Sequence, residues 1–254
     1  MCNARPRKDA GKAQAYHAIT GGYILGEVMR RVTGQDLKEI YKERLQTPLG
    51  AKYMTLGLPE EHRALAADNV FTGYSEPFPV DRIVKNALGG SFDLVCDVSN
   101  SADFLDANIP AGNVYATASE CADFFQVLLD SGKLKNIGTA PLKKNGKPKK
   151  SMFDSVAVTR AINEASPRQF DRTLMIPLRT SEGFMLGDSP FGMYGPNTSS
   201  AFGHLGFINI FCWADPSRDI SVSLLTTGKC LLGPQMPALA KMLVAINKTF
   251  PRYD

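Results

Sequence analysis

Two β-rich runs with a turn between them and an amphipathic helix after them constrain the fold more than any other part of the sequence. The runs are residues 207–214 and 220–226, and the residues between them read Asp-Pro-Ser-Arg-Asp. Because Asp, Pro and Ser favour tight turns, the runs are predicted to pair as an antiparallel hairpin. The closing helix is expected to carry one apolar face, formed by Leu239, Met242, Leu243 and Ile246. A hairpin and a helix, with further helices earlier in the chain, predict an α+β fold in which helices flank an antiparallel sheet.

The N-terminal part of the chain predicts two consecutive helices. Apolar residues at i, i+3, i+4 and i+7 span residues 25–32, and Gly34 follows where a left-handed helix end is expected. A second apolar stripe spans residues 37–45 and is expected to stop before Pro48, which disfavours helix at the residue preceding it. Gly21 and Gly22 interrupt the first pattern, which indicates close packing there or a backbone approach beside a site.

The middle of the chain is less regular. Residues 52–112 predict loops with short helical or extended pieces, whereas Thr117-Ala118-Ser119-Glu120 has the form of a capping box and predicts a helix that Gly132 ends. The lysine-rich residues 143–150 are broken by Asn-Gly and Pro, and we expect a solvated loop rather than an anion-binding patch. No repeat and no clear linker divides the sequence, so a single domain over residues 1–254 is predicted.

Composition excludes several classes of protein. With 254 residues, 44% of them hydrophobic and 21% charged, the chain can bury a core, and its net charge of +4 is too small to predict a nucleic-acid partner. The five cysteines are scattered and never spaced as Cys-x-x-Cys, so neither a disulfide framework nor a zinc site is expected, and no other metal or cofactor is indicated. Reduced thiols, the lack of an apolar leader and the lack of a membrane-length apolar run together predict a cytoplasmic location.

Two short motifs and their surroundings point to a family. Tyr16-His17-Ala18 opens the first helical segment and is followed by Thr-Pro-Leu-Gly after the second, and His204-Leu205-Gly206 opens the apolar run of the hairpin. Gly112-Asn-Val-Tyr-Ala-Thr-Ala-Ser precedes the capped helix. These stretches resemble the serine β-lactamase and penicillin-binding-protein superfamily, in particular class C β-lactamases and family VIII carboxylesterases. The resemblance implies a β-lactamase/transpeptidase-like fold and acyl transfer on a small ester or amide substrate.

The resemblance also implies roles for four residues. Tyr16 would be the general base, and His204, where most of the family has lysine, would hold the tyrosine hydroxyl and the substrate. Gly206 and the amide of Phe207 would form the strand edge beside the oxyanion. A phenol has an ordinary pKa of about 10, so it acts as a base near neutrality only if a nearby cation stabilises the phenolate. His17 and His62 have no partners at metal-ligand spacing and are expected to be structural.

The family's nucleophile is not found in the sequence. No Ser-x-x-Lys occurs, and the resemblance places that motif upstream of the tyrosine, where only fifteen residues stand. The fit of residues 226–229 to Thr-x-x-Lys is expected to be accidental, because it falls at the end of a strand. Ser199 or Ser200 could form a Ser/His pair with His204, although proximity in sequence says little about geometry.

Two readings of the chain therefore remain open. It is predicted to be the C-terminal portion of a serine hydrolase, and Leu205 and Ala18, which replace a threonine and an asparagine of the family, favour an esterase over a true β-lactamase. The alternative is a non-catalytic protein that keeps the fold to bind a ligand or a partner. A shortened chain is also expected to expose an apolar face through which it self-associates.

Overall fold

A computed structural model describes residues 3, 5, 11–137, 152–207 and 209–253. Its centre is a six-stranded sheet in the order β11-β10-β9-β6-β5-β4, in which every pair of neighbouring strands is antiparallel. The α+β fold with an antiparallel sheet is thus confirmed. The six strands are β4 (Glu164–Asp171), β5 (Ile176–Ser181), β6 (Met185–Leu186), β9 (Phe202–Gly206), β10 (Ile210–Asp215) and β11 (Ile220–Leu224).

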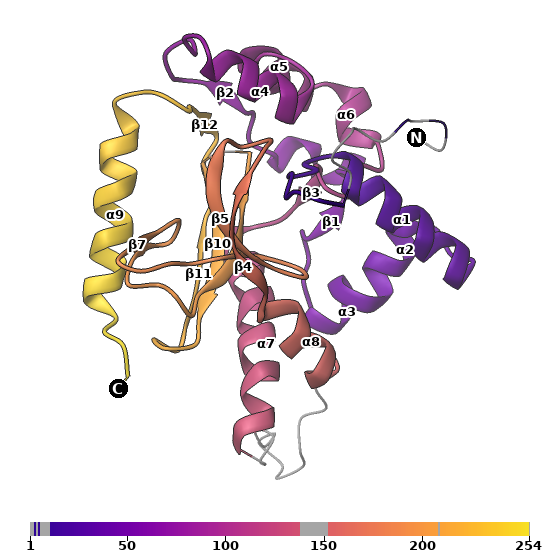
Figure 1. Cartoon of the computed structure of the whole chain (residues 1–254). Helices are drawn as coiled ribbons and strands as arrows, with labels where there is room; N and C mark the ends of the chain where they lie inside the picture. Colours follow the sequence, from indigo (N-terminus) through magenta and orange to yellow (C-terminus); the bar gives the residue numbers. More distant parts are fainter. Residues whose placement is uncertain (1–2, 4, 6–10, 138–151, 208, 254) are drawn as a thin grey trace.

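Helices cover both faces of this sheet (Figure 1). Helix α9 (Gln235–Thr249) packs on one face, where Trp213 and Tyr194 stack with ring centroids 5.4 Å apart. Helices α7 (Ala118–Ile137) and α8 (Ser155–Ile162) pack on the other face, where Phe125 and Phe202 lie in the same buried cluster. The alternation of side chains along β10 explains the two layers, since successive strand residues point to opposite faces.

The C-terminal hairpin is confirmed, but its first strand begins later than the sequence indicates. Strand β10 pairs with β11 from Phe211 opposite Leu224 to Asp215 opposite Ile220. His204-Leu205-Gly206 ends the separate strand β9 instead of opening the strand after it. The break comes at Phe207, whose φ of 29° turns the backbone and whose carbonyl accepts the amide of Asn209 at 2.9 Å.

Two predicted helix ends are wrong, each for a local reason. The helix α2 (Leu37–Tyr41) continues through a π-helical turn at Lys42–Gln46 into α3 (Thr47–Leu49). Pro48 is tolerated because the π-helical turn replaces the ordinary i−4 bonds just before it, as the bond from the Thr47 amide to the Lys42 carbonyl shows. The run ends at Gly50, whose φ is 69°. Helix α7 passes through Gly132 to Ile137, because one glycine lowers helix stability without preventing a helix.

Helix α1 (Thr20–Thr33) ends at Gly34 as predicted, with φ of 73°, but its apolar stripe is not buried. The helix packs on the rest of the chain through its glycine side, where a Cβ on Gly26 would lie 2.8 Å from Leu37 and one on Gly22 would lie 2.7 Å from Ala111. Its large apolar side chains point outward, with Leu25 65% and Val32 80% exposed. The close packing expected at Gly21 and Gly22 is therefore present at Gly22. Helix α1 also carries an exposed apolar face.

The remaining segments are short, as expected for residues 52–112. Three helices and a 3₁₀ turn occur there: Glu60–Leu65, α4 (Val80–Leu88), α5 (Phe92–Ser99) and α6 (Ala102–Asp106). Three two-stranded pairs complete the described chain: β1 (Thr55–Leu56) with β3 (Val114–Tyr115), β2 (Val70–Phe71) with β12 (Gly228–Lys229), and β7 (Phe191–Gly192) with β8 (Gly195–Pro196). The lysine-rich residues 143–150 lie outside the described residues.

Candidate functional site

Tyr16 and His204, which are 188 residues apart in sequence, lie side by side in the structure. Their ring centroids are 5.8 Å apart, with the ring planes tilted by 40°. Both rings line one cavity of about 240 Å³ between the segment before α1 and the β4–β6 part of the sheet. The two residues predicted to be catalytic therefore share a cavity.

Backbone contacts place the two rings. The amide of Arg172, in the turn between β4 and β5, donates to the carbonyl of Gln14 at 3.0 Å and ties the segment before Tyr16 to the sheet. On the other side, β6 pairs with β9 only at Phe202 and Gly203. Because this pairing stops before His204, the end of β9 borders the cavity.

The electrostatics of the pair keep both rings uncharged near neutral pH. Burial raises the pKa of the Tyr16 phenol, and the negative charge of Asp171 raises it further. Burial lowers the pKa of His204, and its Nδ1 lies 2.7 Å from the carbonyl of Leu205. A carbonyl only accepts, so Nδ1 carries the proton and Nε2 of the neutral ring is left as an acceptor. The pair can pass a proton, but His204 supplies no cation that would stabilise a Tyr16 phenolate.

Gly206 and Phe207 lie two and three residues after His204, yet the described residues that line the cavity include neither. The Phe207 ring packs against Phe92, with centroids 5.2 Å apart, and the Nζ of Lys229 lies 5.5 Å from the centroid of the Phe207 ring. The turn after β9 is thus held by side chains from α5 and β12. An oxyanion role for this strand edge stays a prediction.

The substitute nucleophiles considered from the sequence, Ser199, Ser200 and Thr226, are not among the described residues that line the cavity. Ser200 donates its hydroxyl to Asp215 at 2.6 Å, at the turn between β10 and β11, so a Ser200–His204 pair is wrong. Thr226 donates its hydroxyl to the carbonyl of Asn209, and Lys229 donates to the carbonyl of Thr226. The Thr-x-x-Lys segment therefore closes a turn and does not line the cavity.

One lining residue, Asp171, carried no signal that sequence reasoning used. Its side chain is 1% exposed, and Oδ1 accepts the amides of Thr173 at 2.9 Å and Leu174 at 2.8 Å. In sequence it is an ordinary turn-forming aspartate, and in the structure it is the last residue of β4. Only the folding of the β4–β5 hairpin against residues 14–16 brings its charge beside Tyr16.

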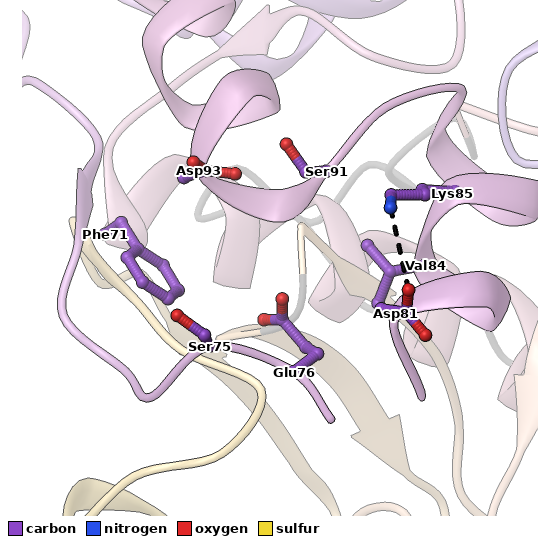
Figure 2. A pocket seen from close by; sticks show the side chains of 8 residues that line it. All are labelled: Phe71, Ser75, Glu76, Asp81, Val84, Lys85, Ser91 and Asp93. Atoms are coloured by element: carbon purple, nitrogen blue, oxygen red, sulfur yellow. Dashed lines mark ion pairs between the residues drawn. The ribbon is translucent and has the colours of Figure 1, made fainter. Parts of the chain in front are cut away.

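A second cavity of about 300 Å³ lies between β2, α4 and α5 and shares no lining residue with the first. Figure 2 shows three carboxylates, Glu76, Asp81 and Asp93, around it, with the ammonium of Lys85 3.5 Å from Asp81. Within the described part of the chain, no three His, Cys, Asp or Glu side chains are grouped closely enough to hold a metal ion.

Comparison with known proteins identifies the family. The family model described as Beta-lactamase matches residues 1–237. The chain belongs to the Beta-lactamase family. This membership agrees with the resemblance of the Tyr16 and His204 motifs and with the sheet and helix arrangement described above.

Relatives of this Beta-lactamase family chain include an esterase and a penicillin-binding-protein homologue. The chain is 27% identical over 241 residues to the esterase/beta-lactamase LipL of Mycobacterium tuberculosis, a match that covers 89% of this chain and 50% of LipL. It is 26% identical to a penicillin-binding-protein homologue from Caulobacter crescentus, with a TM-score of 0.68 and coverage of 94% of this chain and 59% of that one. A family VIII carboxylesterase, at 23% identity and a TM-score of 0.67, shares the fold over 92% of this chain and 59% of its own.

The Beta-lactamase family chain thus spans half the length of LipL and about three-fifths of the two solved structures. None of the helices in the described part of the chain is both long and apolar enough to cross a membrane.

Proposed function

We propose that this chain provides the general-base side of an esterase-like acyl-transfer site, with Tyr16 as the base and His204 as its polar partner. The observation that supports the proposal is the 5.8 Å separation of the two rings in one cavity. Family membership supports hydrolysis, and the replacement of threonine by Leu205 supports esters over β-lactams. The substrate class would be small esters or amides.

The chemistry requires a nucleophile that this sequence does not contain, since no Ser-x-x-Lys occurs in it. A serine hydroxyl from a further polypeptide segment would attack the acyl carbon while Tyr16 removes its proton and passes it to the alcohol or amine that leaves, and water would then hydrolyse the acyl-serine. The raised pKa of Tyr16 keeps the phenol protonated, so it cannot accept the serine proton until a nearby cation stabilises the phenolate, and the lysine of the family's motif would be that cation. Gly206 and Phe207 would form the strand edge beside the oxyanion.

Ester hydrolysis tests the proposal directly. The transcript should be read upstream of Met1 for an in-frame Ser-x-x-Lys, and the native product should be assayed with 4-nitrophenyl acetate. We expect Tyr16→Phe to lower kcat/KM by at least about a hundredfold, the usual contribution of a general base. Tyr115→Phe is the matched control, because Tyr115 is also half-buried but does not line the cavity. Hydrolysis that survives Tyr16→Phe unchanged would refute the assignment.

The second candidate is a non-catalytic protein that binds a ligand or partner. The protonated phenol of Tyr16 favours it, because a neutral phenol does not abstract a proton and the neutral ring of His204 supplies no cation that would stabilise the phenolate. On this reading, the chain unfolds cooperatively, turns over no nitrophenyl ester and is indifferent to Tyr16→Phe. The cytoplasmic location and the single domain over residues 1–254 also stay predictions.

A further inference from the structure

Asp171 lines the Tyr16 cavity, and one of its carboxylate oxygens is unsatisfied. Its side chain is buried, and both turn amides that it accepts, from Thr173 and Leu174, bind Oδ1. Oδ2 is buried and has no hydrogen-bond partner. A buried charged oxygen without a donor is unfavourable, and the usual remedy is a cation or a hydrogen-bond donor placed against it.

The walls of the cavity suit a cation better than an anion. The rings of Tyr16, Phe184 and His204 line it, together with the apolar side chains of Leu178 and Met185. Aromatic faces attract cations, whereas they offer nothing to a carboxylate. Of the described residues that line the cavity, none is lysine or arginine, so none of these residues offers Asp171 a cationic side chain.

The charge of Asp171 acts inside the cavity, because it raises the pKa of the Tyr16 phenol. A donor bound to Oδ2 would therefore both satisfy the carboxylate and weaken its effect on Tyr16. The volume of about 240 Å³ limits such a donor to a small group.

We infer that this cavity binds the primary ammonium group of an amine-bearing substrate, with the N–H donors on Asp171 Oδ2 and the methylene chain against the rings of Tyr16 and Phe184. The inference rests on the proposed function, because the bound amine would be part of the ester or amide that is cleaved. It adds a substrate class: esters or amides that carry an ammonium group, in preference to neutral ones of the same size.

Binding can be tested without any hydrolysis, by ligand-observed NMR titration of the full chain at pH 7. The probes are butylammonium and its uncharged analogue 1-butanol. We expect butylammonium to bind at least tenfold more tightly and Asp171→Asn to bring the ratio of the two Kd values below about threefold. Asparagine keeps an oxygen that accepts the amides of Thr173 and Leu174, so the turn is retained. Asp154→Asn is the matched control, since Asp154 also accepts two backbone amides but lies at the start of α8.

Equal Kd values for the two probes in the unmodified chain would overturn the inference, even if Asp171→Asn does not fold. A preference for butylammonium that Asp171→Asn leaves intact, or that Asp154→Asn also removes, would overturn it as well.

Hydrolysis separates this inference from the proposed function. If Tyr16→Phe abolishes hydrolysis but glycine 4-nitrophenyl ester is cleaved no better than 4-nitrophenyl acetate, the substrate class fails and the function stands. If butylammonium is preferred but no ester is cleaved, the cation site stands and the function fails.

Discussion

The turn between β10 and β11 contains a fully buried ion pair, and breaking it should strongly destabilise the fold. Arg218 donates to Asp215 at 2.5 Å, and the two side chains are 4% and 0% exposed. Asp215 also accepts the hydroxyl of Ser200 at 2.6 Å and the amide and hydroxyl of Ser217 at 3.0 and 2.8 Å. Arg218 donates a further bond to the carbonyl of Asn197 at 3.0 Å. The pair therefore joins the turn to the segment just before β9.

Asp215→Ala should lower the free energy of unfolding by about 3–5 kcal/mol, because it leaves the Arg218 guanidinium buried without its counter-charge. Arg218→Met should lower the free energy of unfolding by less, about 1.5–3 kcal/mol, because the Asp215 carboxylate keeps its donors from Ser200 and Ser217. The double variant should lose less free energy of unfolding than the sum of the two single losses, since no unpaired charge remains in it. A domain is usually stable by only about 5–15 kcal/mol, so the single losses are readily measured.

Urea unfolding followed by circular dichroism measures all four members of this cycle, with the slope of the free energy against urea concentration checked for constancy. Asp188→Ala provides a control in which the free energy of unfolding should change little, because Asp188 pairs with Arg168, whose side chain is 49% exposed. The reasoning is refuted if Asp215→Ala costs less than about 1 kcal/mol, or if the two single losses add without coupling.

Three further predictions follow from the packing. Gly203→Ala should place a Cβ 2.5 Å from the Cβ of Trp213 and so push β9 away from β10. The free energy of unfolding should fall by at least about 1–3 kcal/mol in the same assay. Burial lowers the pKa of Lys229 to about 8 from an ordinary value of 10.5, so the unfolded chain binds more protons between these values and stability should rise with pH there. The free energy of unfolding is measured against pH for the unmodified chain and for Lys229→Met, and the difference between the two curves isolates this gain in stability. We expect the difference to rise by about 1–2 kcal/mol from pH 7.5 to 9.5, and a difference that does not change with pH would contradict the prediction. The exposed apolar face of α1 should cause self-association, which light scattering measures. Val32→Lys should reduce the self-association, whereas Val156→Lys on α8 should not. A chain that stays monomeric at high concentration would contradict this prediction.

Local signals in the sequence predicted much of the fold. Gly34 ends α1 and Thr117 with Glu120 caps α7, because both effects depend on backbone conformation and hydrogen bonds within a few residues. The turn that starts at Asp215 was equally clear. The errors at Pro48 and Gly132 arose where a locally unfavourable residue is accommodated within a longer helical run.

The candidate site was predictable only in part. The motifs identified Tyr16 and His204, and the structure places them in one cavity. Asp171 could not be found in this way, since an aspartate at the end of a strand is typical of turns and its charge matters only through its distance from Tyr16. Likewise, the helical spacing of the apolar residues in α1 predicted the helix but not which side of it the chain buries.

The sequence alone therefore determined the longest helices, the hairpin and the family, because periodicity, capping and motif residues act over short distances along the chain. Only the tertiary structure decided that a phenol, an imidazole and an unsatisfied carboxylate meet in one cavity. It also decided that Asp215 and Arg218 are buried as a pair and that α1 packs through its glycines. Burial and charge interactions depend on distances in space between residues far apart in sequence, and no local pattern records those distances.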